Sequence, residues 1–211
     1  MLVRVSIGNL VPKIKIQETG EEFFVGILNS GAFKKGRRLI QPLGGAAHLA
    51  PYGRKLMEKE GATDFHKSDA RFVVSDANFE WILNWFSIRD SDHFETDPTR
   101  EIMEELSTEE LLDIPPVLTA EEAGAIEVAF VKTVRQKFSD QPGTSPLAIE
   151  GIPSRRLFHL FQMTAPKAVV EKMRASKAIT FLSEEEVATT NGGAKKGVTK
   201  TGDTIADNFI W

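Results

Sequence analysis

Cysteine is absent from the 211-residue sequence, and this absence removes several kinds of site at once. Without a thiolate, the chain has no disulfide, no cysteine-bound zinc or iron–sulfur cluster, and no cysteine nucleophile. An excess of positive charge is also missing, because the formal net charge is −4. Nucleic acid and anionic lipid are therefore disfavoured as partners, since both are attracted to basic surfaces.

Long hydrophobic runs are missing as well. No apolar run approaches the roughly 20 residues that a membrane-spanning helix needs. The opening residues, MLVRVSIGNLVPKIKI, alternate in polarity and are interrupted by Gly8 and Pro12, so they lack the apolar core of a signal peptide. We therefore expect a cytoplasmic protein with no membrane contact. Apolar residues make up 41% of the chain, which is enough for an ordinary buried core.

Strand and helix patterns alternate along the chain. Period-two alternation, apolar runs and turn residues predict strands over 2–7, 13–16, 23–28, 38–43, 71–75, 125–134, 156–163 and 178–182. Apolar residues at helical spacing and proline boundaries predict helices over 52–60, 78–88, 98–112 and 166–175. The segment 183–186 is a capping box that opens another helix. SDQPGTSP is expected to be a loop, and the apolar end of the chain is expected to dock.

Three glutamates stand close together in TREIMEELS, residues 99–107. On a helix, Glu101 and Glu105 are one turn apart and Glu104 is three residues from Glu101, so at least two carboxylates share a face. Arg100 can pair with Glu104 four residues later. One interpretation is a solvated acidic face. The other is a site for Mg²⁺ or Mn²⁺, which bind carboxylate, water and phosphate oxygens.

The run Arg100-Glu101-Ile102-Met103-Glu104-Glu105 resembles the R-E-U-x-E-E core of the Nudix hydrolase signature, G-x5-E-x7-R-E-U-x-E-E-x-G-U, in which U is a bulky apolar residue. Gly44-Gly45, in QPLGGAAHL, resembles the strand-to-glycine entry of that family, and the order of the expected elements also fits. The resemblance covers most of the chain. It implies an α/β (α+β) fold, a Nudix-like α/β/α sandwich with a mixed β-sheet, as one domain over residues 1–211.

Three features depart from the signature. Residues 46–99 separate Gly45 from Arg100 and would form an insertion in the signature loop, which costs little entropy. Asp92 stands where the signature has its early glutamate, and Ser107 stands where it has its closing glycine. Interrupted signatures of this kind look similar to the Nudix domains reported beside bacterial nucleotide second-messenger defence systems.

The resemblance implies a divalent-metal-dependent hydrolase. Its substrate would be a nucleoside diphosphate linked to another moiety, such as ADP-ribose, a sugar nucleotide or a dinucleotide, and its cofactor would be Mg²⁺ or Mn²⁺. By the same analogy, the metal ligands are Glu101, Glu104 and Glu105, with the Gly45 carbonyl close to the metal. These three glutamates and Arg100, which orients a carboxylate, are the expected catalytic residues, and one glutamate acts as the base.

Two alternatives stay open. A catalytically weak Nudix-fold module could bind a nucleotide or a protein partner, as the altered Ser107 and Asp92 suggest. A purely structural domain with a solvated glutamate face is the other. Trp81 and Trp85 fall off the apolar stripe of their expected helix, so they either pack within the domain or contact a second copy in a homodimer. The nucleotide and the general base are not fixed by the sequence.

Overall fold

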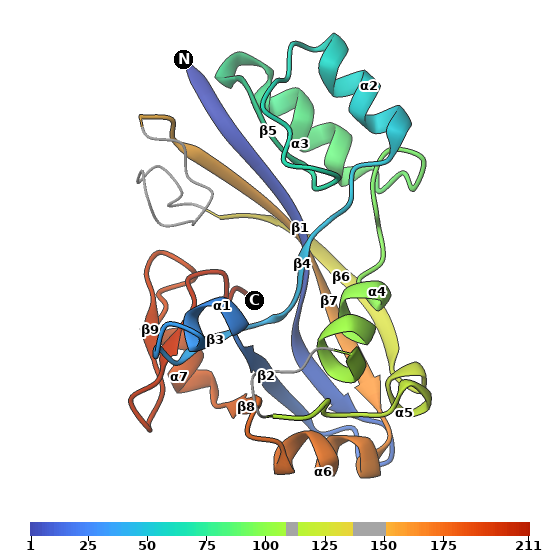
Figure 1. Ribbon diagram of the computed structural model, residues 1–211, viewed down its shortest axis with the longest axis vertical. Helices are drawn as coiled ribbons and strands as arrows, with labels where there is room; N and C mark the ends of the chain where they lie inside the picture. The colour runs from blue at the N-terminus through green and yellow to red at the C-terminus, as the bar shows by residue number, and fades with distance from the viewer. Residues whose placement is uncertain (109–113, 137–150) are drawn as a thin grey trace. The chain divides into compact units, whose positions relative to one another are not determined.

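The computed structural model describes residues 1–108, 114–136 and 151–211 (Figure 1). Two compact units share the chain. Unit 1 comprises Met1–Asn9, Gly45–Asp97 and Thr133–His159, and unit 2 comprises Leu10–Gly44, Pro98–Lys132 and Leu160–Trp211. Nearly all of the expected insertion therefore belongs to unit 1. The single domain stays a prediction, and the loop expected at SDQPGTSP lies outside the described residues.

The strands of the described residues form one mixed hydrogen-bonded sheet. They are β1 (Leu2–Ile16), β2 (Glu22–Leu28), β3 (Leu39–Gln41), β4 (Leu43–Ala46), β5 (Arg71–Ser75), β6 (Glu127–Arg135), β7 (Ser154–Ala165), β8 (Ile179–Leu182), β9 (Gly197–Val198) and β10 (Thr204–Ile205). The pairing order is β6-β7-β1-β2-β3-β10-β9, with β4 and β5 also paired to β1 and β8 to β2. Strands β3 and β10 run parallel, whereas β1 with β2, β1 with β5, β2 with β3, β2 with β8 and β9 with β10 run antiparallel.

The helices are short. They are α1 (Ser30–Phe33), α2 (Pro51–Lys59), α3 (Phe79–Ser87), α4 (Thr99–Met103), α5 (Ala120–Gly124), α6 (Lys167–Ala175) and α7 (Glu184–Ala188), with a 3₁₀ turn η1 (Asp76–Asn78) and a π-helical segment η2 (Glu104–Thr108). The capping box expected at the start of α7 is present, since Ser183 and Glu186 bond each other's backbone amides. With this mixture of helices and a mixed sheet, the predicted α/β (α+β) fold is confirmed.

The first strand corrects the sequence-based expectation of two strands broken at Gly8 and Pro12. Both residues lie inside β1, which continues from Leu2 to Ile16. At Gly8, an ideal Cβ would stand 2.5 Å from the carbonyl oxygen of Gly45. The glycine therefore allows a close approach of backbone and does not make a turn. Proline at position 12 tolerates the extended conformation, because its fixed φ is compatible with it.

The glycine pair also differs from expectation. The run 38–43 was expected to be one strand that ends at the glycines, but β3 and β4 divide it and Gly44-Gly45 lie inside β4. Gly44 has a φ of +94°, a conformation that an L-residue with a side chain rarely adopts. A glycine at position 44 therefore lets β4 adopt this backbone conformation without strain.

Each unit has its own hydrophobic core. In unit 1, the strands pack against helix α3, whose Phe79, Ile82, Trp85 and Phe86 are all buried. Trp85 therefore packs inside its unit, whereas Trp81 is 39% exposed. In unit 2, Ile102 and Leu106 join a core built mainly from β1, β2, α6 and β7.

The end of the chain docks on unit 2, as the sequence predicts. Phe209 is fully buried in the unit 2 core, and its ring meets Phe24 edge-on at a centroid distance of 6.4 Å. Trp211 lies against the same Phe24 ring at 6.3 Å. Among the described residues, no helix has the length and apolar character needed to cross a membrane.

Candidate catalytic site

The glutamate segment begins as an α-helix and widens after one turn. Thr99–Met103 forms α4, and Glu104–Thr108 continues it as the π-helical segment η2. The expected regular helix over 98–112 is therefore wrong beyond Met103, and residues 109–113 lie outside the described part of the chain. π-Helical turns inside helices occur frequently at functional sites.

Two hydroxyl groups give a physical reason for the wider turn. Ser107 Oγ donates to the carbonyl of Met103 at 2.6 Å, and Thr108 Oγ1 donates to the carbonyl of Glu104 at 2.8 Å. In an α-helix these carbonyls accept from the backbone amides four residues on, so the hydroxyls compete with the regular ladder. Ser107, which replaces the closing glycine of the signature, thus takes part in the distortion.

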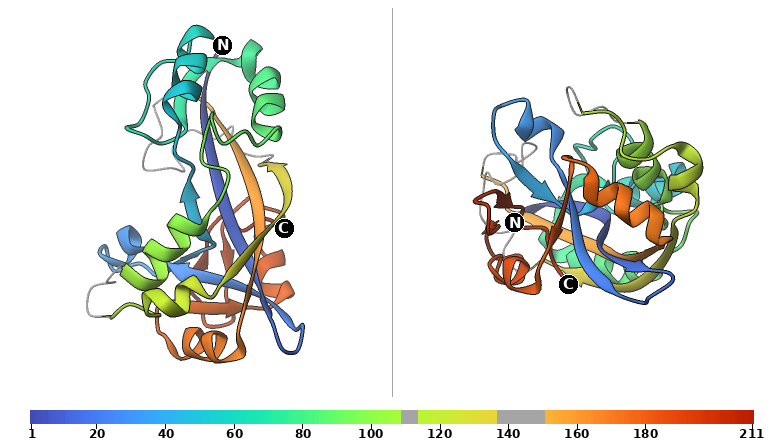
Figure 2. Two further views of the ribbon diagram at one scale, coloured as in Figure 1. Left: turned by 90° about the vertical axis from the view of Figure 1, so that its right-hand side faces the viewer. Right: turned by 90° about the horizontal axis from the view of Figure 1, so that it is seen from below.

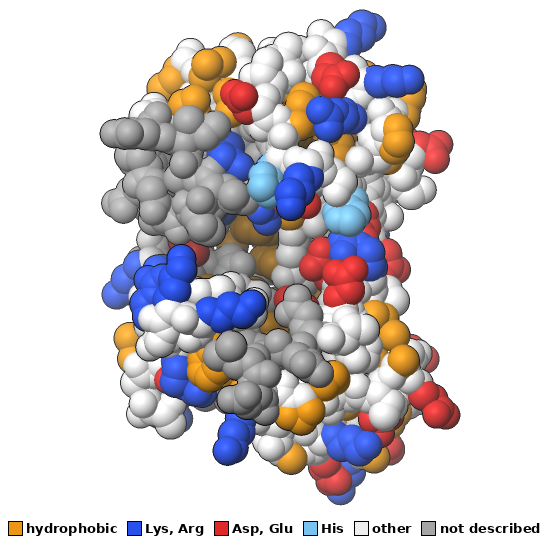
Figure 3. All heavy atoms as spheres, in the orientation of Figure 1, with side chains coloured by type: hydrophobic (Ala, Val, Ile, Leu, Met, Phe, Trp, Pro, Cys, Tyr) orange, Lys and Arg blue, Asp and Glu red, His pale blue; other side chains and the backbone are white. Residues whose placement is uncertain are grey.

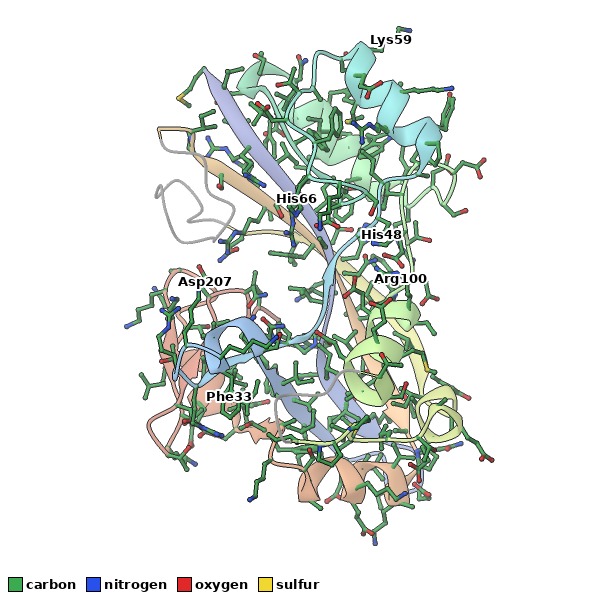
Figure 4. The ribbon with its side chains drawn as sticks, viewed as in Figure 1. Phe33, His48, Lys59, His66, Arg100 and Asp207 are labelled. Carbon is green, nitrogen blue, oxygen red and sulfur yellow. The ribbon has the colours of Figure 1, made fainter. Side chains whose placement is uncertain are left out.

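Arg100 gathers two of the three glutamates. Its Nη2 donates to Glu101 Oε1 at 2.5 Å, and its Nη1 donates to Glu104 Oε2 at 2.8 Å. One guanidinium therefore holds both carboxylates on the same side of the helix, as the spacing predicts. Arg100 lies on α4 (Figure 4), and acidic and basic side chains gather over this helix on the molecular surface (Figure 3).

Glu105 has a different environment. Its side chain is buried, with the residue 8% exposed, and its Oε2 accepts the backbone N–H of Gly44 at 2.8 Å. Leu106 and Ile102 on the same segment are buried in the unit 2 core, and this fixes the rotation of the helix. Glu105 therefore connects the helix to the end of strand β4 that belongs to unit 2.

The remaining two candidate positions belong to unit 1. The carbonyl oxygen of Gly45 approaches the backbone of Gly8, in the neighbouring strand β1. Asp92 lies in a turn after α3, where its backbone N–H donates to Asp90 Oδ1 at 2.9 Å. The structure therefore brings Arg100, Glu101 and Glu104 together. Glu105 follows on the same segment and is bonded to Gly44 instead. Gly45 and Asp92 belong to the other unit.

The donor chemistry fits a hard divalent cation. Carboxylate oxygens on one short helix are ligands that Mg²⁺ and Mn²⁺ prefer. Within the described ranges, however, no three acidic or histidine side chains are already grouped closely enough to hold a metal. Arg100 holds Glu101 and Glu104, and Gly44 holds Glu105, so the carboxylates must turn towards a cation to bind it together.

The mixed α/β fold, with a glutamate-rich helix bonded to a strand that carries Gly44-Gly45, is the arrangement that the resemblance to Nudix domains implies. The comparison with protein families narrows this class. The model of the SMODS-associated NUDIX domain family matches residues 2–208, and the chain belongs to this family. No curated protein and no solved structure matches the chain. The expected relation to Nudix domains associated with defence systems is confirmed.

Sequence reasoning missed one group of residues with binding chemistry. Lys13, Phe24 and Trp211 line a cavity in unit 2, although they are far apart in the chain. The apolar end of the sequence was a local signal for this group. The pairing of Lys13 with Phe24 gave no such signal, because it depends on the register of β1 against β2.

Proposed function

We propose that the chain is a divalent-cation-dependent pyrophosphohydrolase that cleaves the diphosphate linkage of a nucleoside diphosphate joined to another moiety. Membership of a Nudix family supports hydrolase activity in general. The observation that carries the specific proposal is the arrangement of Glu101 and Glu104 on the guanidinium of Arg100. Carboxylates held in this way can bind a cation that in turn binds diphosphate oxygens.

Each side chain has a role in this reaction. Glu101, Glu104 and Glu105 would hold Mg²⁺ or Mn²⁺, and the bound cation would supply charge neutralisation for the diphosphate and a lowered pKa for water. Arg100 orients Glu101 and Glu104 by its two charge-assisted hydrogen bonds. Glu105 also ties its helix to strand β4 by accepting the backbone N–H of Gly44. Water attacks one phosphorus, one bridging P–O bond breaks, and one glutamate accepts the proton of the water.

A substrate library with product mass identification tests the proposal. ADP-ribose, sugar nucleotides, dinucleoside polyphosphates and nucleoside triphosphates are incubated with the purified chain and Mg²⁺. A cation-dependent nucleoside monophosphate product from at least one diphosphate-linked substrate supports the proposal. Absence of any product from the whole library would overturn it.

Cation binding is expected to stabilise the folded protein. A ligand that binds only the native state adds about 1.4 kcal/mol at ten times its Kd, which raises the Tm of a chain of this size by about 3 °C or more. The measurement is thermal unfolding with Mn²⁺ against EDTA. Glu104→Gln should remove the shift, because it takes away the charge of one cation ligand. The Glu104 side chain is 51% exposed, so the substitution leaves the core intact.

The matched control is Glu121→Gln, which removes an exposed carboxylate from α5. This variant should keep the full Mn²⁺ shift. An equal Tm with Mn²⁺ and with EDTA in the unsubstituted chain would instead support a solvated glutamate face.

A second candidate function is a module that binds a nucleotide or a protein without turnover. The bond between Glu105 and Gly44 favours this candidate, because it engages a carboxylate that catalysis requires at the cation. The two functions separate in one experiment. A binding module would show Mn²⁺ stabilisation or nucleotide binding and give no product in the substrate library.

A further inference from the structure

Two cavities in unit 2 share a wall. The larger has a volume of about 300 Å³ and the smaller about 200 Å³, and Lys13, Phe24 and Glu184 line both. We call these two adjoining cavities together the Lys13 groove. None of the four expected catalytic side chains lines it. In Figure 2, α4 and the C-terminus lie on different sides of strand β1, so the groove is separate from the glutamate helix.

The larger cavity has an aromatic wall. The rings of Phe24 and Trp211 meet nearly at right angles, with an interplanar angle of 89° and a centroid distance of 6.3 Å. Phe24 is almost fully buried, whereas Trp211 is 36% exposed. The indole therefore offers part of its surface to a planar ligand, and stacking on an aromatic ring does not require a particular base.

Two ammonium groups lie beside the same indole. Lys13 Nζ is 4.5 Å from the ring centroid of Trp211 and 4.7 Å from that of Phe24. Lys132 Nζ is 5.7 Å from the Trp211 centroid. The Lys13 side chain is only 13% exposed, and its Nζ lies 4.0 Å from Glu22 Oε2, a long distance for an ion pair. A partly desolvated ammonium interacts more strongly with an anion than a fully solvated one does.

Two carboxylates also line the groove, Glu22 in the smaller cavity and Glu184, the first residue of α7, in both. A carboxylate only accepts hydrogen bonds, so it suits a ligand that carries hydroxyl or amino donors. An aromatic wall, the Lys13 ammonium and the Glu184 acceptor therefore line a volume at the small end of the range for ligand sites, and Lys132 lies beside the Trp211 ring.

We propose that the Lys13 groove binds a nucleoside monophosphate at a site separate from the glutamate helix. The base stacks on Trp211, the phosphate binds Lys13 and Lys132, and the ribose hydroxyls donate to Glu184. Inorganic phosphate alone would leave the aromatic wall unused, and a purely apolar ligand would bury the Lys13 ammonium without an anion. This inference goes beyond the proposed hydrolysis and holds whether or not the chain turns over a substrate.

Calorimetric titration of the full chain with AMP, GMP, CMP and UMP tests the site, in EDTA so that no cation occupies the glutamates. Lys13→Met keeps the length of the side chain and removes its charge. It should weaken nucleotide binding about tenfold or more, which corresponds to one lost charge-assisted hydrogen bond. Binding of the parent nucleoside, which has no phosphate, should change by less than about twofold. Lys15→Met, on the same strand and outside both cavities, is the matched control.

The aromatic half of the site has its own variants. Trp211→Ala should weaken nucleotide and nucleoside alike by about tenfold. Trp211→Phe should retain most of the binding, because the phenyl ring still offers a face for stacking, and thermal unfolding of both variants shows whether each is folded. Glu104→Gln should bind all four nucleotides as tightly as the unsubstituted chain does.

Three results would overturn the inference. The first is the absence of saturable binding of any of the four nucleotides up to about 10 mM. The second is binding that Lys13→Met and Trp211→Ala leave unchanged. The third is binding that Glu104→Gln removes, because the nucleotide would then occupy the glutamate helix. The first two leave the proposed hydrolysis untested by this titration, so failure of the groove and failure of the catalytic proposal are distinguishable.

Discussion

Replacing Glu105 by glutamine is expected to lower the turnover number for the best substrate by about 100-fold or more, because a cation ligand loses its negative charge. Glutamine has nearly the same shape, and its amide oxygen can still accept the N–H of Gly44. The free energy of unfolding should therefore fall by no more than about 1 kcal/mol. Steady-state kinetics with the substrate found in the library screen measures the first effect, and denaturant unfolding measures the second.

The choice of glutamine matters because Glu105 is buried. Alanine at this position would leave the amide of Gly44 without this acceptor and would mix a folding defect with a catalytic one. Glu121→Gln is the control for removing an acidic charge elsewhere on unit 2, and it should keep full turnover. Normal turnover by Glu105→Gln would contradict the assignment of this residue to the cation site.

Acidification is expected to destabilise unit 1 through His159. Its ring is fully buried and stacks on Phe86 at a centroid distance of 3.8 Å. Nε2 lies 3.1 Å from the carbonyl oxygen of Phe86, and because a carbonyl only accepts, Nε2 carries the proton of the neutral ring. Burial, followed by the positive charge of Arg89, lowers the pKa of His159 to about 3, against an opposing effect of the Phe86 carbonyl.

The direction of the pH effect follows from the lowered pKa. The unfolded chain binds a proton at His159 near pH 6.5, while the folded chain resists this proton down to about pH 3. Stability from the neutral ring is therefore complete above pH 6.5 and is lost progressively between these two values. At pH 5 the expected loss from this residue is about 2 kcal/mol relative to pH 7.5.

The measurement is denaturant unfolding at both pH values for the unsubstituted chain and for His159→Gln. Glutamine can donate to the Phe86 carbonyl and does not titrate, so this variant should lose about 2 kcal/mol less on acidification. His48→Gln is the matched control, because His48 is exposed, and it should follow the unsubstituted chain. Equal acid sensitivity of His159→Gln and the unsubstituted chain would show that other groups cause the effect.

The position of the candidate site could be predicted from the sequence, since it depends on local spacing. Arg100 lies next to Glu101 and four residues before Glu104, and a single helical turn is enough to bring these side chains together. The wider turn after Met103 could not be predicted in the same way. The bonds from the Ser107 and Thr108 hydroxyls to the carbonyls of Met103 and Glu104 accompany the wider turn, but serine and threonine at these positions are also compatible with a regular helix.

Contacts between distant parts of the chain explain the other differences. Gly8 carries the signal of a turn, but it lies inside β1, where the backbone of Gly45 in β4 comes too close for a side chain. The bond from Gly44 to Glu105 and the meeting of Lys13 with Trp211 likewise join residues from separate strands and helices. Periodicity within one element predicts its buried face and contains no information on which element covers it.

Cleavage in ¹⁸O-labelled water, with Mg²⁺ and followed by mass spectrometry, tests the proposed hydrolysis most directly. If water attacks phosphorus at the glutamate helix, one of the two phosphate products must carry one ¹⁸O atom for each linkage broken. The reaction should require the cation, and Glu105→Gln should slow the formation of labelled product by about 100-fold or more. No labelled product from any diphosphate-linked nucleotide, or equal labelled product from Glu105→Gln, would contradict the proposed function.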